Sequence, residues 1–265
     1  MPSHRSSKVD LLPSAPLTRR GMLGFAASSA IGVVVSQSVL GFEPAQALAG
    51  DTTGPTATDS TGSGAVASCV LTAALTEGPF FVDEKLNRSD IRSDPTTGAV
   101  SSGRPLQLTF NVARVASNAC TPLTGAYLDV WHCDAAGVYS DVSGAVGRRF
   151  LRGYQITDAS GVAKFTTVYP GWYHGRAVHV HFKLRLIAGA TTTYEFTSQF
   201  FFDDAFTDTV YASSPYSGRG TRSTRNASDG IYNGLSSSEK AALTLVTTPS
   251  GDGYGGVINL GVRLA

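Results

Sequence analysis

Apolar and polar residues alternate with a period of two along much of the chain after residue 105. This period is typical of β-strands that bury one face. The runs that show it, and that we predict to be strands, are Leu106 to Val112, Ala126 to Cys133, Ala163 to Thr167, Val178 to Ile187, Tyr194 to Phe202 and Val257 to Val262. Because glycine-rich segments separate them, the pattern predicts an all-β fold, a β-sandwich of mostly antiparallel strands with long loops.

One short helix is predicted near the C-terminus, from about Ser236 to Val246. Ser236 and Glu239 have the spacing of a capping box, in which each residue satisfies a backbone N–H group of the other. Apolar residues at helical spacing follow this pair. We see no internal repeat.

The first 49 residues are predicted to be a twin-arginine signal peptide. Arg19 and Arg20 precede an apolar stretch from Leu23 to Val35, and small residues around Ala47 and Ala49 have the spacing of a signal-peptidase site. The apolar stretch is shorter than the roughly 20 residues that a membrane span needs. We therefore expect a protein that is secreted or otherwise extracytoplasmic, with no membrane contact after cleavage.

The rest of the chain divides into a linker and one domain. Residues 50–68 are rich in Gly, Ser, Thr and Ala, so they bury no core and are predicted to be a flexible linker. Residues 69–265 are predicted to form a single catalytic domain, because about 200 residues suffice for one substantial core.

Charge and cysteine content limit the partners. The net charge is +1, from 21 Lys and Arg against 20 Asp and Glu, and no basic stripe indicates nucleic acid. The three cysteines allow one disulfide in an exported protein. Cys120 and Cys133 lie at opposite ends of a predicted strand and pair poorly, so Cys69 with Cys120 is our hypothesis. No Cys-x-x-Cys indicates a thiolate metal site.

Four residues form a candidate iron site: Tyr139, Tyr173, His179 and His181. Fe(III) is a hard cation that favours phenolate oxygen, and imidazole also suits iron, so this set fits Fe(III) better than Zn(II). A free tyrosine has a pKa of about 10, so a bound cation must keep both phenols deprotonated.

The spacing allows these residues to meet. The period of two from Val178 to Ile187 places His179 and His181 on the same face of one strand. Tyr173 follows the Pro170-Gly171 turn, and Tyr139 follows the turn from Asp134 to Val138.

Each residue also has a simpler interpretation. Either tyrosine alone is more often a packing residue, and a His-x-His pair without partners is more often a surface pair. Arg176 alone is typical of a solvated charge, and Gln199 of an ordinary strand residue. The interpretation as a site depends on the combination.

Motifs around the four residues occur in a fixed order. They are Thr76 to Phe81, Trp131 to Tyr139, Pro170 to Tyr173, Gly175-Arg176, His179 to Phe182, Gln199 to Phe201, and a closing run from Pro215 to Ile231. In these motifs the chain, from about Cys69 onward, resembles the intradiol ring-cleavage dioxygenases, the non-haem Fe(III) enzymes that open catechols between their two hydroxyls.

The resemblance implies a role for each residue. Tyr139 would be the equatorial tyrosinate and Tyr173 the axial one, with His179 and His181 completing a set that holds one Fe(III) per chain. Tyr173 would leave the metal when substrate arrives and accept a catechol proton. Arg176 would stabilise negative charge on the ring carbon that O2 attacks, and Gln199 would line the pocket.

The implied partners are a small aromatic diol and O2, and the implied product is a cis,cis-muconate-type diacid. The resemblance leaves the preferred catechol open. The oligomeric state is also open, although we expect it to differ from that of relatives with an N-terminal helical dimerisation region.

Several positions depart from the pattern of the family. Phe80 and Phe81 stand where many relatives have a tyrosine, and His174 is an added imidazole for which an exposed loop residue is the simpler interpretation. His132 shares a face with Leu128 and Val130, which predicts a hydrogen-bonded core histidine. Arg152, like Arg92 and Arg104, is interpreted as a surface charge, with a substrate carboxylate as the alternative.

Two other classes of function stay open. The first is a secreted β-sandwich that binds aromatics or polysaccharide without turnover, suggested by the export signal and by Trp131 and Trp172. The second is a structural β domain with an empty site. The complete set of four residues, together with Arg176, favours the enzyme.

Overall fold

The structure is a computed structural model that describes residues 70–117 and 119–264. The predicted signal peptide (residues 1–49), the predicted linker (residues 50–68) and Cys69 lie outside the described residues, so these predictions stay predictions. No helix among the described residues is long and apolar enough to cross a membrane.

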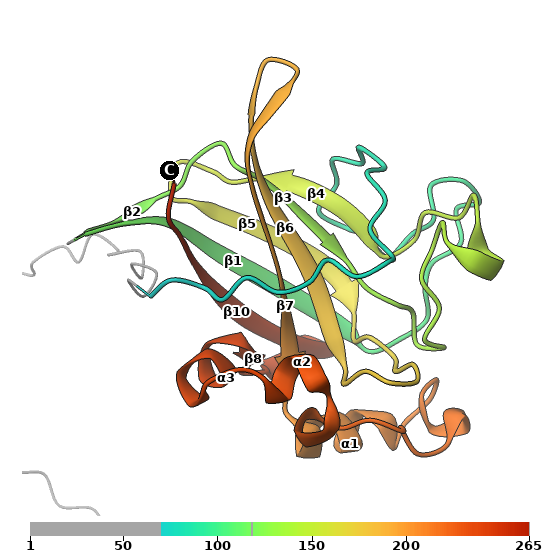
Figure 1. The fold of residues 1–265 in the computed structure, drawn as a ribbon. Helices are drawn as coiled ribbons and strands as arrows, with labels where there is room; N and C mark the ends of the chain where they lie inside the picture. The colour runs from blue at the N-terminus through green and yellow to red at the C-terminus, as the bar shows by residue number, and fades with distance from the viewer. Residues whose placement is uncertain (1–69, 118, 265) are drawn as a thin grey trace, which may run out of the picture. The chain divides into compact units, whose positions relative to one another are not determined.

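Two mixed β-sheets form the domain (Figure 1). The strands of the first are β1 (Pro105–Ala116), β2 (Ala119–Pro122), β5 (Val162–Val168), β9 (Thr248–Ser250) and β10 (Gly253–Val262). Those of the second, in spatial order, are β4 (Arg152–Ile156), β3 (Tyr127–Trp131), β6 (His179–Ala188), β7 (Thr191–Phe202) and β8 (Thr244–Leu245). The pairs β1 with β10 and β7 with β8 are parallel, and the other pairings between these strands are antiparallel. The predicted fold class is confirmed.

Aromatic side chains join the two sheets across the main core. Phe110 of β1 lies with its ring centre 5.9 Å from that of Phe182 on β6 and 6.1 Å from that of Phe200 on β7. Phe165 of β5 packs on Phe110 from within the same sheet, at 5.9 Å. These rings occupy the apolar positions of the predicted strands, so the period of two did select the buried face.

The helices α1, α2 and α3 follow β7 in the chain and lie together at one end of the sheets (Figure 1), whereas the first 3-10 turn, η1, comes between β3 and β4. The bounds are α1 (Asp204–Tyr211), α2 (Gly230–Asn233) and α3 (Ser237–Leu243) for the helices, and η1 (Ser143–Ala145), η2 (Ser217–Arg219) and η3 (Asn226–Ser228) for the 3-10 turns. The predicted helix is α3, and its capping box between Ser236 and Glu239 is present. It ends at Leu243, earlier than predicted, because the next two residues pair with Phe201 and Phe202 as β8. The helices α1 and α2 were not predicted from the sequence.

Residues 73–82, which we call the covering segment, cross the outer face of the second sheet (Figure 1). The N–H of Leu75 donates to the Thr197 carbonyl at 3.0 Å, and the Ser198 hydroxyl donates to the Ala73 carbonyl at 2.7 Å. Lys183 on β6 forms an ion pair with Glu77. Because of this cover, β6 is buried on both faces, including its polar side.

The cysteines agree with the prediction as far as the structure describes them. Cys120 is disulfide-bonded, whereas Cys133 is a buried free thiol. The partner predicted for Cys120 lies outside the described residues, so that pairing stays a prediction.

His132 is a core histidine, as predicted. Its Nδ1 donates to the Cys133 carbonyl at 2.8 Å, and its Nε2 accepts from the Thr167 hydroxyl at 2.7 Å. Burial lowers the pKa of His132 to about 4, although the hydrogen bond to the Cys133 carbonyl opposes this effect. The ring is therefore neutral at physiological pH.

The lowered pKa of His132 predicts acid destabilisation. Because this pKa is about 4 in the folded state and about 6.5 when unfolded, the unfolded chain binds the extra proton between these values. Stability therefore falls as pH drops through this window, by about 2 kcal/mol between pH 7 and pH 5 for this residue. We expect His132→Gln to be less stable at pH 7 but to lose about 2 kcal/mol less over that interval, as measured by urea unfolding. Equal pH dependence of stability in the wild-type protein and in His132→Gln would contradict the prediction.

Candidate metal centre

The histidine pair lies on the outer face of β6, which the covering segment closes. His179 pairs across the strands with Phe201, and His181 with Gln199, and both imidazoles are buried. Between them, Val180 points into the main core. The alternation therefore places both rings on one side of a rigid central strand.

The two predicted tyrosines come from loops that pack directly on one another. The Gly171 N–H donates to the Asp134 carbonyl at 3.0 Å. A side chain at Gly171 would approach the Ala135 carbonyl oxygen to 2.5 Å, and one at Gly137, where φ is +80°, would approach the Trp172 carbonyl oxygen to 2.2 Å. Neither position has room for a Cβ atom, so two glycines allow the Tyr139 and Tyr173 loops to meet.

The structure brings all four candidate ligands together. The Nε2 atom of His179 lies 3.0 Å from Nε2 of His181, 3.1 Å from Oη of Tyr173 and 3.4 Å from Oη of Tyr139. We call these four atoms the donor cluster. Two ligand atoms that are each about 2.1 Å from a metal, at an angle of about 90 to 110°, are separated by about 3.0 to 3.4 Å. The three distances measured from Nε2 of His179 therefore fit one shared cation.

Neighbouring groups orient the imidazoles. Nδ1 of His179 donates to the Ala177 carbonyl at 2.6 Å, which leaves the lone pair of Nε2 free to face the cluster. The indole of Trp131 stacks on the His181 ring, with ring centres 4.9 Å apart and planes 6° apart. Nδ1 of His181 is buried and has no hydrogen-bond partner among the described residues.

Burial dominates the electrostatics of the four side chains. It lowers the pKa of His179 to about 3, with the charge of Arg176 adding to the effect, and lowers the pKa of His181 well below its usual value. Both rings are therefore neutral and able to bind metal. Burial also raises the pKa of Tyr173 to about 12, against the charge of Arg176, and raises the pKa of Tyr139 well above its usual value. Without a cation the phenols stay protonated, so binding of a metal must release their protons.

The donor set fits ferric iron. Two phenol oxygens and two imidazole nitrogens, all buried, suit a hard trivalent cation. Among the described residues, no group of three or more His, Cys, Asp or Glu side chains could hold a metal. The tyrosines are therefore what makes this cluster a candidate centre.

Arg176 and Gln199 lie beside the donor cluster, in contrast to their simpler interpretations. Nη1 of Arg176 is 3.5 Å from Nε2 of His179. Its Nη2 donates to Oε1 of Gln199 at 2.5 Å, and its Nε donates to Oδ2 of Asp229 at 2.9 Å. Gln199 is fully buried and donates from Nε2 to the Thr76 carbonyl at 2.7 Å. A cation is thus held next to the four donor atoms.

The phenylalanines that depart from the family pattern form an apolar wall. Phe80 stacks on Tyr139 with ring centres 4.4 Å apart and meets Tyr173 edge-on at 5.9 Å. Phe81 packs on Trp131 at 4.9 Å. Neither ring offers a hydrogen bond to a phenolate. His174 is exposed, as its simpler interpretation predicted.

Arg152 is buried, so its interpretation as a surface charge was wrong. It donates from Nε to the Ser140 hydroxyl at 2.8 Å and from Nη1 to the Phe80 carbonyl at 3.3 Å. It thereby links the residue after Tyr139 to the covering segment. Because these N–H groups already donate to protein oxygen atoms, the structure does not support a role for Arg152 in binding a substrate carboxylate.

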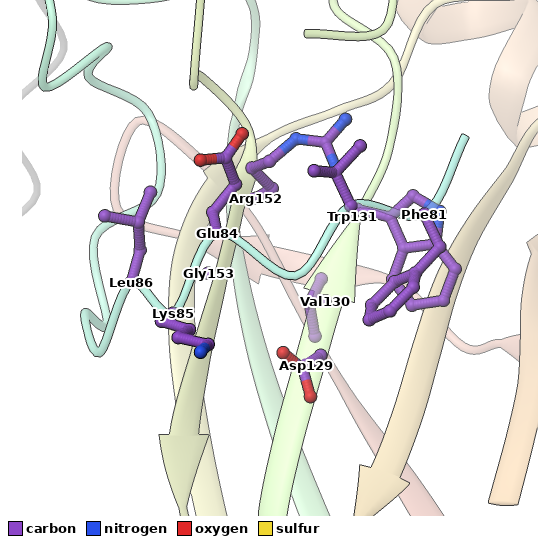
Figure 2. A pocket seen from close by; sticks show the side chains of 10 residues that line it. Phe81, Glu84, Lys85, Leu86, Asp129, Val130, Trp131, Arg152 and Gly153 are labelled. Atoms are coloured by element: carbon purple, nitrogen blue, oxygen red, sulfur yellow. The ribbon is translucent and has the colours of Figure 1, made fainter. Parts of the chain in front are cut away.

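A small cavity of about 10 Å³ lies beside Phe81, which is one of its lining residues (Figure 2). Trp131, Arg152, Asp129 and Glu84 line it, and the indole nitrogen of Trp131 has no hydrogen-bond partner among the described residues. A volume near 10 Å³ accommodates about one water molecule. The cavity is therefore too small to hold a substrate.

Sequence reasoning missed Asp229 and the contact between Trp131 and His181. Asp229 precedes the glycine that begins α2, so its position as a helix cap was readable. Its contact with Arg176 joins residues 53 positions apart, and no local pattern encodes such a contact. The stacking of Trp131 on His181 depends in the same way on the pairing of β3 with β6.

Comparison with known proteins places these features in a family. A family model described as Dioxygenase (Dioxygenase_C) matches residues 76–224. The chain is 32% identical over 99 residues to a hydroxyquinol 1,2-dioxygenase of Corynebacterium glutamicum, a match that spans 37% of this chain and 31% of that enzyme. The matched region covers about a third to a half of the length of the curated relatives.

Two solved structures are similar over most of the described domain. An intradiol ring-cleavage dioxygenase from Tetranychus urticae has 29% identity and a TM-score of 0.62, and the match covers 74% of this chain and 95% of that one. The dioxygenase domain of a dioxygenase and carbohydrate-binding protein fusion from Streptomyces sp. SirexAA-E has 26% identity and a TM-score of 0.52, with 74% and 100% covered. With more than half of its length matched by the family model, the chain belongs to the intradiol ring-cleavage dioxygenase family.

Proposed function

We propose that the chain is an exported Fe(III) intradiol dioxygenase that cleaves catechol-type rings between the two hydroxyls. The observation that carries the proposal is the donor cluster, in which three atoms lie within 3.4 Å of Nε2 of His179. Membership of a family that uses non-haem Fe(III) supports the choice of metal. Bound Fe(III) would activate the catechol toward O2, and both oxygen atoms would enter a cis,cis-muconate-type diacid.

The chain's own residues would perform the remaining steps. Tyr173 would hold and then release the metal, and its Oη would accept a catechol proton. It suits this role because it is only partly buried, whereas Tyr139 is fully buried. Nη1 of Arg176 would stabilise negative charge that develops on the substrate ring, since it lies 3.5 Å from Nε2 of His179 in the donor cluster. Gln199 would hold that guanidinium in place, and Phe80 would form an apolar wall for an aromatic ring.

We also propose export through the twin-arginine route. Support comes from Arg19 and Arg20, the apolar stretch after them and the small residues up to Ala49. This route carries folded proteins, which suits a protein that must acquire its metal before export.

Oxygen uptake is the test of the proposed activity. Purified protein should contain one iron per chain, absorb visible light through charge transfer from tyrosinate to iron, and consume one O2 per catechol with a muconate-type product. A panel of catechol, protocatechuate and hydroxyquinol would identify the preferred ring.

His179→Ala should lose both iron and oxygen uptake, because it removes one of four ligands, whereas the exposed neighbour variant His174→Ala should retain both. An iron-loaded protein that is colourless, or one that binds catechol without consuming O2, would refute the activity.

Tyr173→Phe tests the proton acceptor. The change removes one oxygen from the donor cluster and retains the ring, so we expect the charge-transfer band to shift and kcat to fall by about 10²- to 10⁴-fold, the usual contribution of a general base. The matched control is Tyr154→Phe, whose ring packs on Tyr127. Stopped-flow absorbance would follow substrate binding and turnover separately. An unchanged band together with an unchanged kcat would exclude Tyr173 from both roles.

The export signal is testable by substitution of both arginines. In a host with a twin-arginine system, Arg19→Lys with Arg20→Lys should leave the full-length precursor inside the cell, because that system reads the arginine pair. Fractionation and blotting would locate the protein, and Arg5→Lys, upstream of the motif, serves as the control. Equal export of all forms would show that another signal operates.

A further inference from the structure

We propose that Asp229 is a positioning residue for Arg176, holding the guanidinium so that Nη1 faces the donor cluster. The inference rests on the proposed function in one respect, since the fixed charge matters for turnover only if the cluster carries out that chemistry. Asp229 lies outside residues 76–224, the part of the chain that the family model matches.

The carboxylate of Asp229 does more than cap a helix. Its Oδ1 accepts from the backbone N–H groups of Ile231, at 2.8 Å, and Tyr232, at 3.1 Å, which is the ordinary N-cap interaction of α2. Its Oδ2 is directed to a different part of the chain, where it accepts from the Ala177 N–H at 2.7 Å and from Nε of Arg176 at 2.9 Å. One oxygen of Asp229 therefore caps α2, and the other accepts hydrogen bonds from the turn before β6.

The cap of α1 provides an internal comparison. Asp203 accepts from the Phe206 N–H at 2.8 Å, so a single oxygen is enough to cap that helix. Asp203 is exposed, whereas Asp229 is fully buried, with 0% of its surface accessible. Burying a carboxylate is costly unless it is paired, so the position of Asp229 is explained by its pairing with Arg176.

Two anchors determine the plane of the Arg176 guanidinium. Asp229 holds Nε, and Gln199 holds Nη2 through its Oε1 at 2.5 Å. Gln199 is itself fixed, because its Nε2 donates to the Thr76 carbonyl of the covering segment. Two hydrogen bonds to different nitrogens restrain rotation of the planar guanidinium and so keep Nη1 near its position 3.5 Å from Nε2 of His179.

The charge of Asp229 also opposes movement of Arg176 away from the site. The Arg176 side chain is 18% exposed, so it has access to water, where a cation would otherwise be better solvated. Burial alone would raise the pKa of Asp229, but the hydrogen bond from Ala177 and the charge of Arg176 hold that pKa below its usual value. The carboxylate therefore stays ionised and retains the cation beside the donor cluster.

Asp229→Asn is the direct test. The amide can keep the helix cap with its oxygen, but it then presents N–H groups to the donors of Ala177 and Arg176. We expect kcat with catechol to fall by about 10- to 100-fold, comparable to other changes behind a metal site. Iron content and the visible band should stay at wild-type values, because the four ligand residues are untouched. Asp203→Asn is the matched cap control and should leave kcat unchanged.

A double-mutant cycle separates positioning from a merely structural role. If Asp229 acts through Arg176, adding Asp229→Asn to Arg176→Gln should lower kcat no further. Independent multiplication of the two losses would overturn the proposal, as would wild-type kcat in Asp229→Asn. Asp229→Ser is the second variant should Asp229→Asn not fold, because serine caps helices but is too short to reach Arg176.

A readout that does not depend on activity completes the test. Nitrogen-15 arginine spectra would be recorded on the Ga(III)-loaded protein, and the Nε–H signal of Arg176 would be assigned by its absence in Arg176→Gln. In the wild-type protein this N–H group should exchange slowly with solvent. The signal should exchange rapidly in Asp229→Asn and stay protected in Asp203→Asn. Continued protection in Asp229→Asn would overturn the positioning role. A wild-type protein that consumes no O2 with catechol would instead defeat the proposed function, and the spectra would still decide the role of Asp229.

Discussion

Side chains of β6 point alternately to its two faces, and this alternation positions the candidate site. Alternate residues of this strand enter the core between the sheets, and the residues between them, His179 and His181, face the opposite way. A slip of one residue would exchange the two sets and place imidazoles in the aromatic core. The packing of Phe182 and Phe200 against Phe110 fixes that register, so the energy of the core also orients the candidate ligands.

A polar strand face becomes a dry site only when it is covered. The covering segment and the two tyrosine loops close the outer face of β6, and the close approach at Gly137 and Gly171 lets those loops meet. Burial then keeps both imidazoles neutral and both phenols protonated until a cation arrives. The same low dielectric makes an unpaired charge costly, which is why the Arg176 guanidinium next to the cluster is paired with a buried carboxylate.

The fold class and the four candidate ligands were readable from the sequence, because both follow from local rules. Period-two alternation identified the buried faces of the strands, and the residue types of the Tyr, Tyr, His, His set indicated the metal. What was missed depends on contacts distant in sequence. Arg152 was interpreted as a surface charge, because no local pattern shows that Phe80 and Ser140 would surround it. The end of α3 was placed too late, because strand pairing with β7 stops the helix before its propensity does.

The proposed function requires that one ferric ion binds among the four donor atoms. A crystal structure of the iron-loaded protein, with diffraction recorded on both sides of the iron absorption edge, tests it directly. We expect one anomalous peak per chain, about 2 Å from Oη of Tyr139, Oη of Tyr173 and Nε2 of both histidines. An anomalous peak elsewhere on the chain, or the absence of one between these four atoms in a protein that contains iron, would contradict it.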